Sequence, residues 1–596
     1  MKVLGLSAHF HDAAAALVVD GRLVAAAAEE RFSRLRHDPS FPRHAARFCL
    51  ERGGFPAEEL DAVVFYEEPH QKFTRVMATT FGGFPRTLGP FVDAMKGWLS
   101  HKLFVRGGIS KALDVHPDVI QLVPHHLSHA AAAFAGAGAD EAAVLVVDAV
   151  GEWASTSLGR ARRGHGIEVF ETVDYPHSLG LFYGAMTAFF GFRPNADECT
   201  TMALAAFGRP TRRDDLQQVL RLESEGAYTL DPGYFDFLRT DGALFTPKFR
   251  ALFGDPAPRG LFAELDAMAS DAEIPPAAQV FADLAASVQE HLQDALLGLA
   301  RRLYRLAPCE TLAIAGGVAL NCVAVRRLAA EGPFRRVVIP PDPGDGGGAI
   351  GAAWLGADPR FEGRADPVGP YLGDVPRGEL LDDMLSALDS ETWQGGAGTL
   401  ATRSPRAVRW HRGPELIPEV ARRLAAGQAV GWVQGRFEFG PRALGARSLL
   451  LAPGRVDRAR QVSRTIKHRA SLRPYALACT EESASAVFVE RPPESLERWM
   501  QTSADVRPEA LPGLRAAVHV DGTTRPQVVH AQELPRFHAL LEAFAAETGG
   551  APALLNTSLN ERGEPIVGSA VEALALFART DLDALAVDDL LIWKEW

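Results

Sequence analysis

Residues 3–30, VLGLSAHFHDAAAALVVDGRLVAAAAEE, and residues 143–161, AVLVVDAVGEWASTSLGRA, begin with the same pattern. Each starts with an apolar strand, continues through a polar loop and returns in a second strand. In the first stretch, Asp20-Gly21 is a strong signal for a hairpin turn into a third strand. Two such openings predict a duplicated α/β unit with a cleft between its halves. We expect the acidic loop of each half to face that cleft.

The composition narrows the class of protein. The chain has 596 residues with 62 Lys or Arg and 74 Asp or Glu, which gives a formal net charge of −12. Its length predicts roughly two to four domains, and its negative charge argues against nucleic acid as a partner. The first stretch, MKVLGLSAHFHDAAAALVVDGR, is too polar for a signal peptide, and no later stretch is apolar enough to span a bilayer. We therefore expect a soluble cytoplasmic protein with no membrane partner.

Proline, glycine and charge are concentrated between about residues 357 and 380, without a clear hydrophobic period. We place the domain boundary there. The prediction is a first domain over 1–360, a linker over 361–380 and a second α/β domain over 381–596. Within the first domain, residues 210–275 have weak periodicity and are predicted to be an insertion or a lid.

Two glycine loops follow apolar strands in the first domain: LAIAGGVALNCVAVRRLAAEG at 312–332 and RRVVIPPDPGDGGGAIGAAWLG at 335–356. Glycines between a strand and a helix let backbone N–H groups approach a phosphate closely, although tight strand-to-helix packing is an alternative explanation. Two such loops in one half favour nucleotide binding. The chain has no GxxxxGK[ST] motif, so the nucleotide site is not a P-loop. The predicted contacts are Gly316, Gly317, Asn321, Gly346 and Gly347.

Histidines cluster in VPHHLSHAAAAF, residues 123–134. His125 and His129 are four apart, so on a helix they share one face and can bind one metal ion. Asp148 and Asp345 each follow an apolar strand, where open α/β sheets place their ligands. The four side chains suit Fe(II), Mn(II), Zn or Mg with positions left open for substrate. The alternative is that the histidines pack locally and the first aspartate is a turn residue.

Longer motifs carry a resemblance to a known family. FHDAAAALVVDGRLVAAAAEERFSRLRHDPSFP, HHLSHAAAAF, VVDAVGE, GGVALN and DPGDGGGAIGAA are followed by GWVQGRFEFGPRALGARSLL, IKHRASLRPYA, HVDGTTRPQVV and LLNTSLNERGEPIV. In this order they resemble the NodU/CmcH-type O-carbamoyltransferases, and the resemblance covers nearly the whole chain. It implies an actin-like (ASKHA) N-terminal domain, similar to the metal-binding subunit of the tRNA threonylcarbamoyl-adenosine machinery, and a YrdC-like C-terminal domain.

The resemblance also implies a reaction. The family uses ATP and carbamoyl phosphate to form carbamoyl-adenylate, then passes the carbamoyl group to a hydroxyl of a small molecule. His125, His129, Asp148 and Asp345 correspond to the family's metal ligands, with Fe(II) the favoured ion. The acceptor is expected to be a natural product or sugar, as in antibiotic biosynthesis, and the sequence does not name it. A homodimer is left open.

Basic residues in the C-terminal half lie in or beside predicted turns. Carbamoyl phosphate and ATP are anions, for which Arg supplies bidentate forks and Lys a point charge. For any one arginine the alternative is a solvated surface charge. Ser558, with Asn556 in the NTSLN motif, can donate to a carbonyl or phosphate oxygen. The predicted anion-binding residues are Arg442, Arg447, Lys467, Arg473 and Asn556, with Arg525 and Ser558 serving the carbamoyl phosphate step.

His11, in FHDA, is predicted to deprotonate or position the acceptor hydroxyl, because a histidine titrates near neutral pH. The other candidate for this role is His9, and the alternative is that His11 is a loop histidine that hydrogen-bonds to the backbone.

One motif departs from the family, which commonly reads like EYKVMGLAPYG where this chain has ECTTMALAAFG. Thr200 and Ala203 thus replace a lysine and a glycine, and compensation by Arg193 is left open.

Two other functions remain open at this point. One is a tRNA threonylcarbamoyl-type transferase, against which the acidic charge counts. The other is a non-catalytic nucleotide sensor on the actin-like fold, which Thr200 would favour and the retained basic second domain would not.

Overall fold

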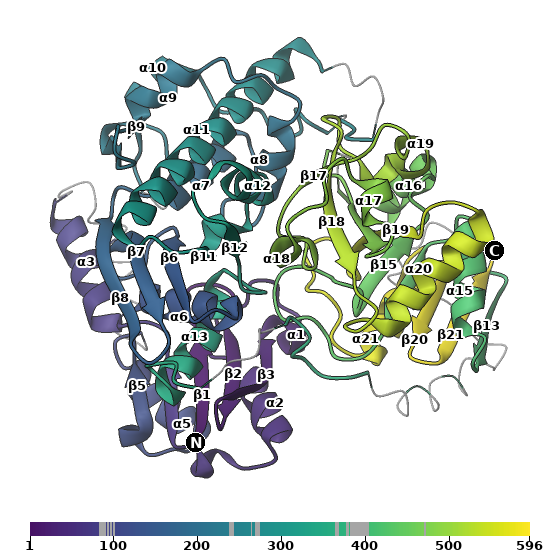
Figure 1. The fold of residues 1–596 in the computed structure, drawn as a ribbon, viewed down its shortest axis with the longest axis horizontal. Helices are drawn as coiled ribbons and strands as arrows, with labels where there is room; N and C mark the ends of the chain where they lie inside the picture. The colour runs from purple at the N-terminus through teal and green to yellow at the C-terminus, as the bar shows by residue number, and fades with distance from the viewer. Residues whose placement is uncertain are drawn as a thin grey trace. The chain divides into compact units, whose positions relative to one another are not determined.

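The two openings found in the sequence form the first three strands of one sheet and the first two strands of another, and the two sheets have the same strand order (Figure 1). In the first sheet, β1 (Lys2–Ser7), β2 (Ala14–Val19) and β3 (Arg22–Ala28) are antiparallel neighbours, and β4 (Ala62–Phe65) and β5 (Ile120–Leu122) extend the other side of β1 in parallel. The hairpin between β2 and β3 turns at Asp20 and Gly21, whose φ angles are +48° and +72°.

The second sheet repeats this arrangement. Its antiparallel strands are β6 (Glu141–Val147), β7 (Ala154–Arg162) and β8 (Gly166–Asp174), and β11 (Thr311–Ala315) and β12 (Arg336–Val338) lie parallel to β6 on its other side. The orders β3-β2-β1-β4-β5 and β8-β7-β6-β11-β12 are equivalent. The predicted duplication is therefore confirmed, and with it the actin-like α/β class of the N-terminal half.

The coordinates are a computed structural model. It describes residues 1–82, 91, 95, 98, 102–237, 244–263, 265–268, 274–363, 369–376, 381, 385, 405–469 and 472–596. Two compact units are present: unit 1 comprises Met1–Glu29, His37–Leu261 and Pro275–Gly369, and unit 2 comprises Glu30–Arg36, Phe262–Ile274 and Pro370–Trp596. Of the predicted linker, residues 364–368 and 377–380 lie outside the described residues. No helix in the described ranges is long and apolar enough to cross a membrane.

The two units differ from the predicted division in two short segments, which belong to unit 2 although they lie within residues 1–360. In the first, the buried Arg31 donates to the carbonyl oxygens of Glu438 and Gly440, at 3.3 and 3.1 Å. Arg34 donates to the carbonyl oxygen of Ile566 at 2.8 Å. The second segment is held by an ion pair between Asp266 and Arg460. These contacts are remote in sequence, so no local pattern indicates them.

Two helices join the halves of unit 1 reciprocally. Helix α6 (His125–Ala137) follows the last strand of the first sheet but packs on strands β6 and β11 of the second. Helix α13 (Asp345–Ala357) follows the last strand of the second sheet but packs on β1, β2 and β4 of the first. The two helices also pack on each other, so their first turns, which carry the predicted ligands, lie close together.

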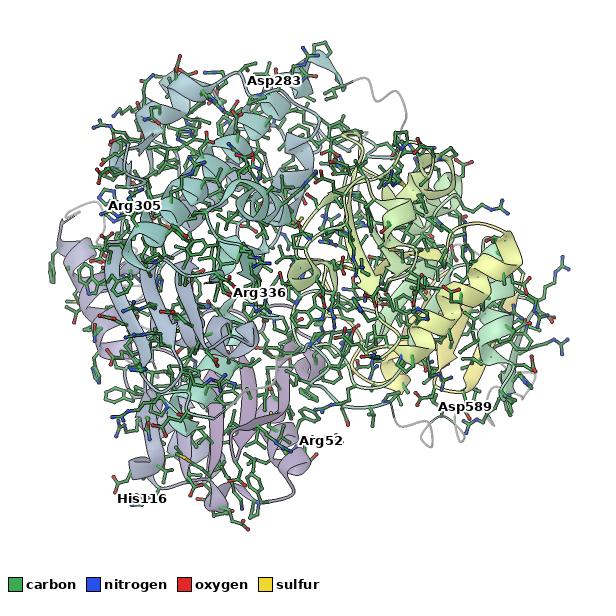
Figure 2. The ribbon with its side chains drawn as sticks, in the orientation of Figure 1. Arg52, His116, Asp283, Arg305, Arg336 and Asp589 are labelled. Carbon is green, nitrogen blue, oxygen red and sulfur yellow. The ribbon has the colours of Figure 1, made fainter. Side chains whose placement is uncertain are left out.

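The remaining helices of unit 1 cover these sheets and build a subdomain. They are α2 (Arg43–Gly53), α3 (Pro69–Gly82), α5 (Val105–Leu113), α7 (Leu179–Phe189), α8 (Glu198–Ala205), α9 (Arg213–Val219), α10 (Pro247–Phe253), α11 (Pro276–Leu306) and α12 (Cys322–Glu331). Asp283 and Arg305 lie toward opposite ends of α11 (Figure 2). The predicted insertion contains α9, the hairpin of β9 (Leu220–Leu222) and β10 (Tyr228–Leu230), and α10; α9 packs on α11.

Unit 2 is built on a nine-stranded mixed sheet, which agrees with the α/β prediction for the second domain; its likeness to YrdC stays a prediction. In sheet order the strands are β13 (Ala407–Arg412), β21 (Leu590–Glu595), β20 (Ala584–Val587), β14 (Val430–Val433), β15 (Arg447–Leu451), β19 (Ala553–Ser558), β16 (Ala476–Thr480), β18 (Thr523–Val529) and β17 (Ala504–Asp505). Its helices are α1 (Glu30–Ser33), α15 (Leu416–Ala425), α16 (Val456–Thr465), α17 (Ala484–Val487), α18 (Glu494–Glu497), α19 (Leu511–Leu514), α20 (Pro535–Thr548) and α21 (Ala570–Arg579).

Alternation along the central strands of unit 2 gives the sheet two apolar faces. On β14, Trp432 belongs to a core formed with α15 and α20, whereas Val433 belongs to a core formed with α16 and α21. On β20, Ala586 and Leu585 divide between the same two cores. Both faces of the sheet are therefore buried.

We predict that Gly351→Ala destabilises unit 1. Gly351 lies in α13 where it crosses α6, and a Cβ there would overlap the carbonyl oxygen of Ser128. The backbones would have to separate, at a cost of about 1–3 kcal/mol. Urea unfolding measures this. The matched control is Gly108→Ala in α5, where nothing lies within 4 Å of the new methyl group; this variant should gain up to about 1 kcal/mol. Equal effects of the two substitutions would contradict the close packing of α6 and α13.

Candidate functional site

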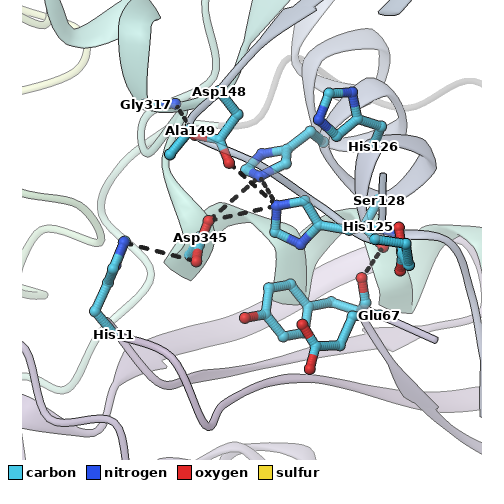
Figure 3. Close-up of polar contacts among 12 residues, drawn as sticks. His11, Glu67, His125, His126, Ser128, Asp148, Ala149, Gly317 and Asp345 are labelled. Carbon is cyan, nitrogen blue, oxygen red and sulfur yellow. Dashed lines mark hydrogen bonds and ion pairs between the residues drawn. The ribbon is translucent and has the colours of Figure 1, made fainter. Parts of the chain in front are cut away.

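The four predicted metal ligands meet in unit 1 (Figure 3). Nε2 of His125 lies 3.1 Å from Nε2 of His129 and 3.3 Å from Oδ2 of Asp148. Oδ1 of Asp345 lies 3.6 Å from Nε2 of His125 and 3.5 Å from Nε2 of His129. One ligand atom from each residue lies within 4.8 Å of the others, and all four residues are buried.

Local structure explains this convergence. The two histidines are one turn apart at the start of α6, and Asp345 is the first residue of α13. Asp148 follows β6, and its Oδ1 accepts a hydrogen bond from the backbone N–H of Gly317 at 2.9 Å, so that its Oδ2 faces the histidines. Gly316 has φ +91°, and a Cβ there would overlap the backbone of Val147. The first glycine loop therefore helps to position a ligand carboxylate.

The donor set fits a divalent cation. Two ligand atoms about 2.1 Å from a common ion are separated by roughly 3.0–3.4 Å, and the two Nε2 atoms are 3.1 Å apart. Two neutral imidazoles and two carboxylates carry a net charge of about −2, which one divalent ion balances. In addition, Oδ2 of Asp345 is buried without a hydrogen-bond partner in the described structure. These residues could hold a metal ion, with the mixture of nitrogen and oxygen favouring a transition metal over Mg.

The electrostatics of the cluster show how strongly it attracts positive charge. Burial opposes the protonated form of His125, but the hydrogen bond with Asp148 and the charge of Asp345 outweigh it and raise its pKa to about 9. Burial also opposes the charged form of Asp148. The hydrogen bond from His125 and the charge of His129 nevertheless hold the pKa of Asp148 well below its usual range. His126 points to Ser157, 2.7 Å away, and burial with the neighbouring His125 lowers its pKa to about 3.

His11, the residue predicted to act on the acceptor, lies beside the cluster. Its Nε2 is 3.9 Å from Oδ2 of Asp345, and its Nδ1 is 2.9 Å from Oδ2 of Asp12. Asp12 is held in turn by Nδ1 of His37 at 2.7 Å. Burial lowers the pKa of His11, but the charges of Asp345 and Asp12 raise it to about 9. Asp12 and His37 both lie in the first motif that carries the family resemblance, but their separation of 25 residues did not indicate that they pair.

The other predicted nucleotide contacts are involved in packing. Asn321 caps α12 by accepting from the N–H of Ala324 at 3.0 Å, and its amide pairs with Gln289. Cβ atoms at Gly346 and Gly347 would overlap Asp342. Close packing is therefore sufficient to explain these glycines, and their contact with a nucleotide stays a prediction.

The departing motif, residues 198–208, forms α8 and the turn after it. Thr200 is half-buried on α8, and Ala203 is buried. Arg193, the predicted compensating cation, is mostly exposed, and its Nε lies 3.4 Å from Oδ2 of Asp197. Compensation by this arginine stays an open prediction.

Unit 2 brings several predicted anion-binding residues together. Nζ of Lys467 donates to the carbonyl oxygen of Ser558 at 2.8 Å, to its Oγ at 3.1 Å and to Oδ1 of Asn560 at 2.6 Å. Burial lowers the pKa of this lysine well below its usual value, and Arg469, Arg473 and Arg36 lower it further. The lysine therefore lies in a strongly positive environment that an anion would relieve.

Arg525 and Asn556 lie in one row across the sheet. On β16, Ala476 pairs with Arg525 of β18 on one side and with Asn556 of β19 on the other. Residues in one row point to the same face. Nε of Arg525 and Oδ1 of Asn556 are both buried without a partner in the described part of the chain. A donor and an acceptor are thus available on this face.

Arg447, by contrast, is fully engaged within the protein. It is 0% exposed and donates to the carbonyl oxygens of Gln434, Gly435, Ala446, Gly568 and Asp374, at 2.9–3.2 Å. Its contacts support a role in holding loops together better than one in binding phosphate. Arg442, half-buried in the neighbouring turn, is at the surface of the same loop.

Sequence reasoning missed Glu438, in the FEFGPRALG stretch. This residue is 0% exposed, and its Oε1 accepts from the N–H groups of Leu444, Ala446 and Arg447, at 2.7, 2.8 and 3.2 Å. It therefore fixes the loop that carries Arg442. A glutamate between two phenylalanines was the available signal, because such a carboxylate is seldom buried without donors.

Two family models match the chain: Carbamoyltransferase N-terminus over residues 2–354 and Carbamoyltransferase C-terminus over residues 421–594. The chain belongs to the carbamoyltransferase family. The resemblance stated from the motifs and the predicted enzyme class are both confirmed.

Relatives support the same class. The chain is 38% identical to the protein sll1178 of Synechocystis sp., with 99% of this chain and 96% of that protein covered. It is 32% identical to the nodulation protein NolNO of Sinorhizobium fredii, with 98% and 79% covered. It is 33% identical to the 3'-hydroxymethylcephem-O-carbamoyltransferase of Amycolatopsis lactamdurans, with 52% and 53% covered.

We predict that His125→Ala and His129→Ala each lower the metal content of the purified protein at least tenfold, since a site that loses one of four ligands binds far more weakly. The control is His126→Ala, one position away, whose ring faces Ser157 and not the cluster. Elemental analysis per folded chain measures the effect. Full occupancy in both ligand variants would refute the assignment.

We also predict opposite effects for two arginines of unit 2. Arg447→Met should cost about 3–5 kcal/mol of stability, because it removes hydrogen bonds to five carbonyl oxygens, those to Gln434, Ala446 and Gly568 being buried. Arg525→Met should change stability by less than about 1 kcal/mol, because Nε has no partner to lose. Urea unfolding followed by the fluorescence of tryptophans, including the buried Trp432, reports both. A stable Arg447→Met variant would contradict the structural role of Arg447 in holding these loops together.

Proposed function

We propose that the chain is an ATP-dependent O-carbamoyltransferase. It forms carbamoyl-adenylate from carbamoyl phosphate and ATP, and transfers the carbamoyl group to a hydroxyl of a small molecule. The observation that carries this proposal is the presence of two chemically different sites. Unit 1 has a buried cluster suited to a cation, with His11 beside it, and unit 2 has a basic cluster suited to an anion.

The basic cluster of unit 2 serves adenylate formation. Atom balance requires that phosphate leave carbamoyl phosphate with entry of water, and that the carbamate oxygen then displace pyrophosphate from the α-phosphorus of ATP. Both reactants are polyanions, so the step needs fixed cations. Arg525 supplies a guanidinium with an unpartnered Nε, and Lys467 holds Ser558 in place. Arg473, whose charge acts on Lys467, would add to this positive potential, and Arg442 is proposed as a further cation.

The cluster of unit 1 serves transfer. His11 is held by Asp12 at Nδ1, which leaves Nε2 to position the acceptor hydroxyl. A divalent ion would offset the carboxylate charges that raise the pKa of this ring, so that Nε2 could also accept the hydroxyl proton. The hydroxyl oxygen bonds to the carbamoyl carbon, and AMP leaves with the electron pair of the broken bond. A divalent ion bound by His125, His129, Asp148 and Asp345 would supply Lewis acidity for an oxygen of the adenylate. Fe(II) is favoured by the family resemblance, with Mn, Mg and Zn as alternatives.

The acceptor is proposed to be a hydroxylated small molecule. One relative is named for transfer to a hydroxymethylcephem and others for nodulation, so antibiotic-like scaffolds and sugars are the first acceptors to screen. A tRNA acceptor and a non-catalytic sensor are the rival functions. Pyrophosphate release from ATP and carbamoyl phosphate without tRNA supports the transferase, and none with any divalent metal supports the sensor.

The division of labour between the two units is tested with two substitutions. Arg525→Ala removes a charge facing a dianion, worth about 2 kcal/mol or more, so pyrophosphate release should fall at least roughly 30-fold. His11→Ala should leave that release unchanged. Supplied with synthetic carbamoyl-adenylate and an acceptor, the Arg525 variant should recover transfer and the His11 variant should not. Failure of both to recover, or normal transfer by His11→Ala, would contradict the scheme.

A further inference from the structure

Glu152 lies four residues after the ligand Asp148, in the same loop, and is buried. Its carboxylate contacts two other segments of unit 1. Oε1 accepts from the backbone N–H of His125 at 3.0 Å and from that of Glu68 at 2.8 Å, and Oε2 lies 3.2 Å from the same His125 nitrogen. None of the sequence motifs assigned a role to this residue.

The contact with His125 completes the start of a helix. His125 is the first residue of α6, and the preceding Pro124 provides no side-chain cap. The first N–H groups of a helix have no partner within it, and a carboxylate there satisfies them and interacts favourably with the helix dipole. Glu152 supplies this cap from a distant part of the chain. It thereby fixes the rotation of the turn that carries His125, and with it the direction of His129 one turn later.

Neighbouring contacts make this arrangement tight. A Cβ on Gly151 would lie 3.1 Å from a ring carbon of both His125 and His126, so a side chain there would push against the two imidazole rings. On the other side, the ring of Tyr66 packs edge-on against His125, with centroids 5.1 Å apart. Ser128 of α6 donates to the Tyr66 carbonyl oxygen at 3.1 Å. The loop and the end of β4 therefore hold the first turn of α6 between them.

We propose that Glu152 is a positioning residue of the metal site. One end of its loop provides the ligand Asp148, and the other end fixes the helix that provides His125 and His129. Loss of the carboxylate leaves all four ligands in the chain but misaligns their donor atoms. This inference rests on the metal site of the proposed function and adds to it a residue that touches no metal.

The experiment measures metal affinity and not activity. The full chain is stripped with a chelator, and the dissociation constant for Zn(II) is obtained by competition with a chromophoric chelator. Co(II) is then added, and its visible absorption spectrum reports the coordination geometry. Thermal unfolding is recorded for every variant. The variants are Glu152→Ala, Glu152→Gln and the control Glu68→Gln, which keeps the backbone N–H that Glu152 binds.

Glu152→Ala should bind Zn(II) about 10–100-fold more weakly and give an altered Co(II) spectrum. Glu152→Gln keeps an oxygen acceptor without the charge, so it should lose less affinity and retain the Co(II) spectrum. Glu68→Gln should match wild type in both. Wild-type affinity and spectrum in Glu152→Ala would overturn the inference, as would a Gln variant as weak as the Ala variant with unchanged unfolding. A wild-type chain that binds neither ion would instead contradict the metal site, and the positioning role with it.

Discussion

Burial of two carboxylates beside two imidazoles is the constraint on which the rest of unit 1 depends. Asp148 and Asp345 are 8% and 2% exposed, and an uncompensated buried carboxylate is costly enough that a protein normally pairs it, protonates it or coordinates it to a metal. Without a cation, the neighbouring carboxylates favour the protonated form of His125 and raise its pKa to about 9. A divalent ion would replace that proton and release the imidazole nitrogen as a ligand.

The duplicated fold explains how these charges come to one point. Each half carries a sheet of the same order, and the helix that follows each sheet packs on the other sheet. The first turns of α6 and α13 are thereby brought together at the end of β6. Small residues such as Gly351 permit the close approach of the two helices. The site is therefore built from regular elements and their immediate ends, where side-chain directions are well defined.

Much of the fold of unit 1 and of its metal site could be predicted from the sequence, because the motifs that indicate them are local. The spacing of His125 and His129 and the strand before Asp148 indicated a shared metal site, and the structure brings these side chains together. Glu152 was missed because the N–H groups that its carboxylate binds, those of His125 and Glu68, lie in other segments of the chain. Glu438 binds N–H groups only six to nine residues away, and it was missed because a carboxylate that binds the backbone of an irregular loop has no characteristic spacing. The membership of residues 30–36 in unit 2 depends on carbonyl oxygens contacted by Arg31 and Arg34, which are remote in sequence.

The central claim is that the buried cluster binds a cation, and anomalous X-ray diffraction from protein purified without chelators tests it. We expect one strong anomalous peak about 2.0–2.2 Å from Nε2 of His125, Nε2 of His129 and one oxygen of each aspartate. The absorption edge would identify the element. Crystals that show no such scatterer among these four side chains, even after soaking in Fe(II) or Zn(II), would contradict it.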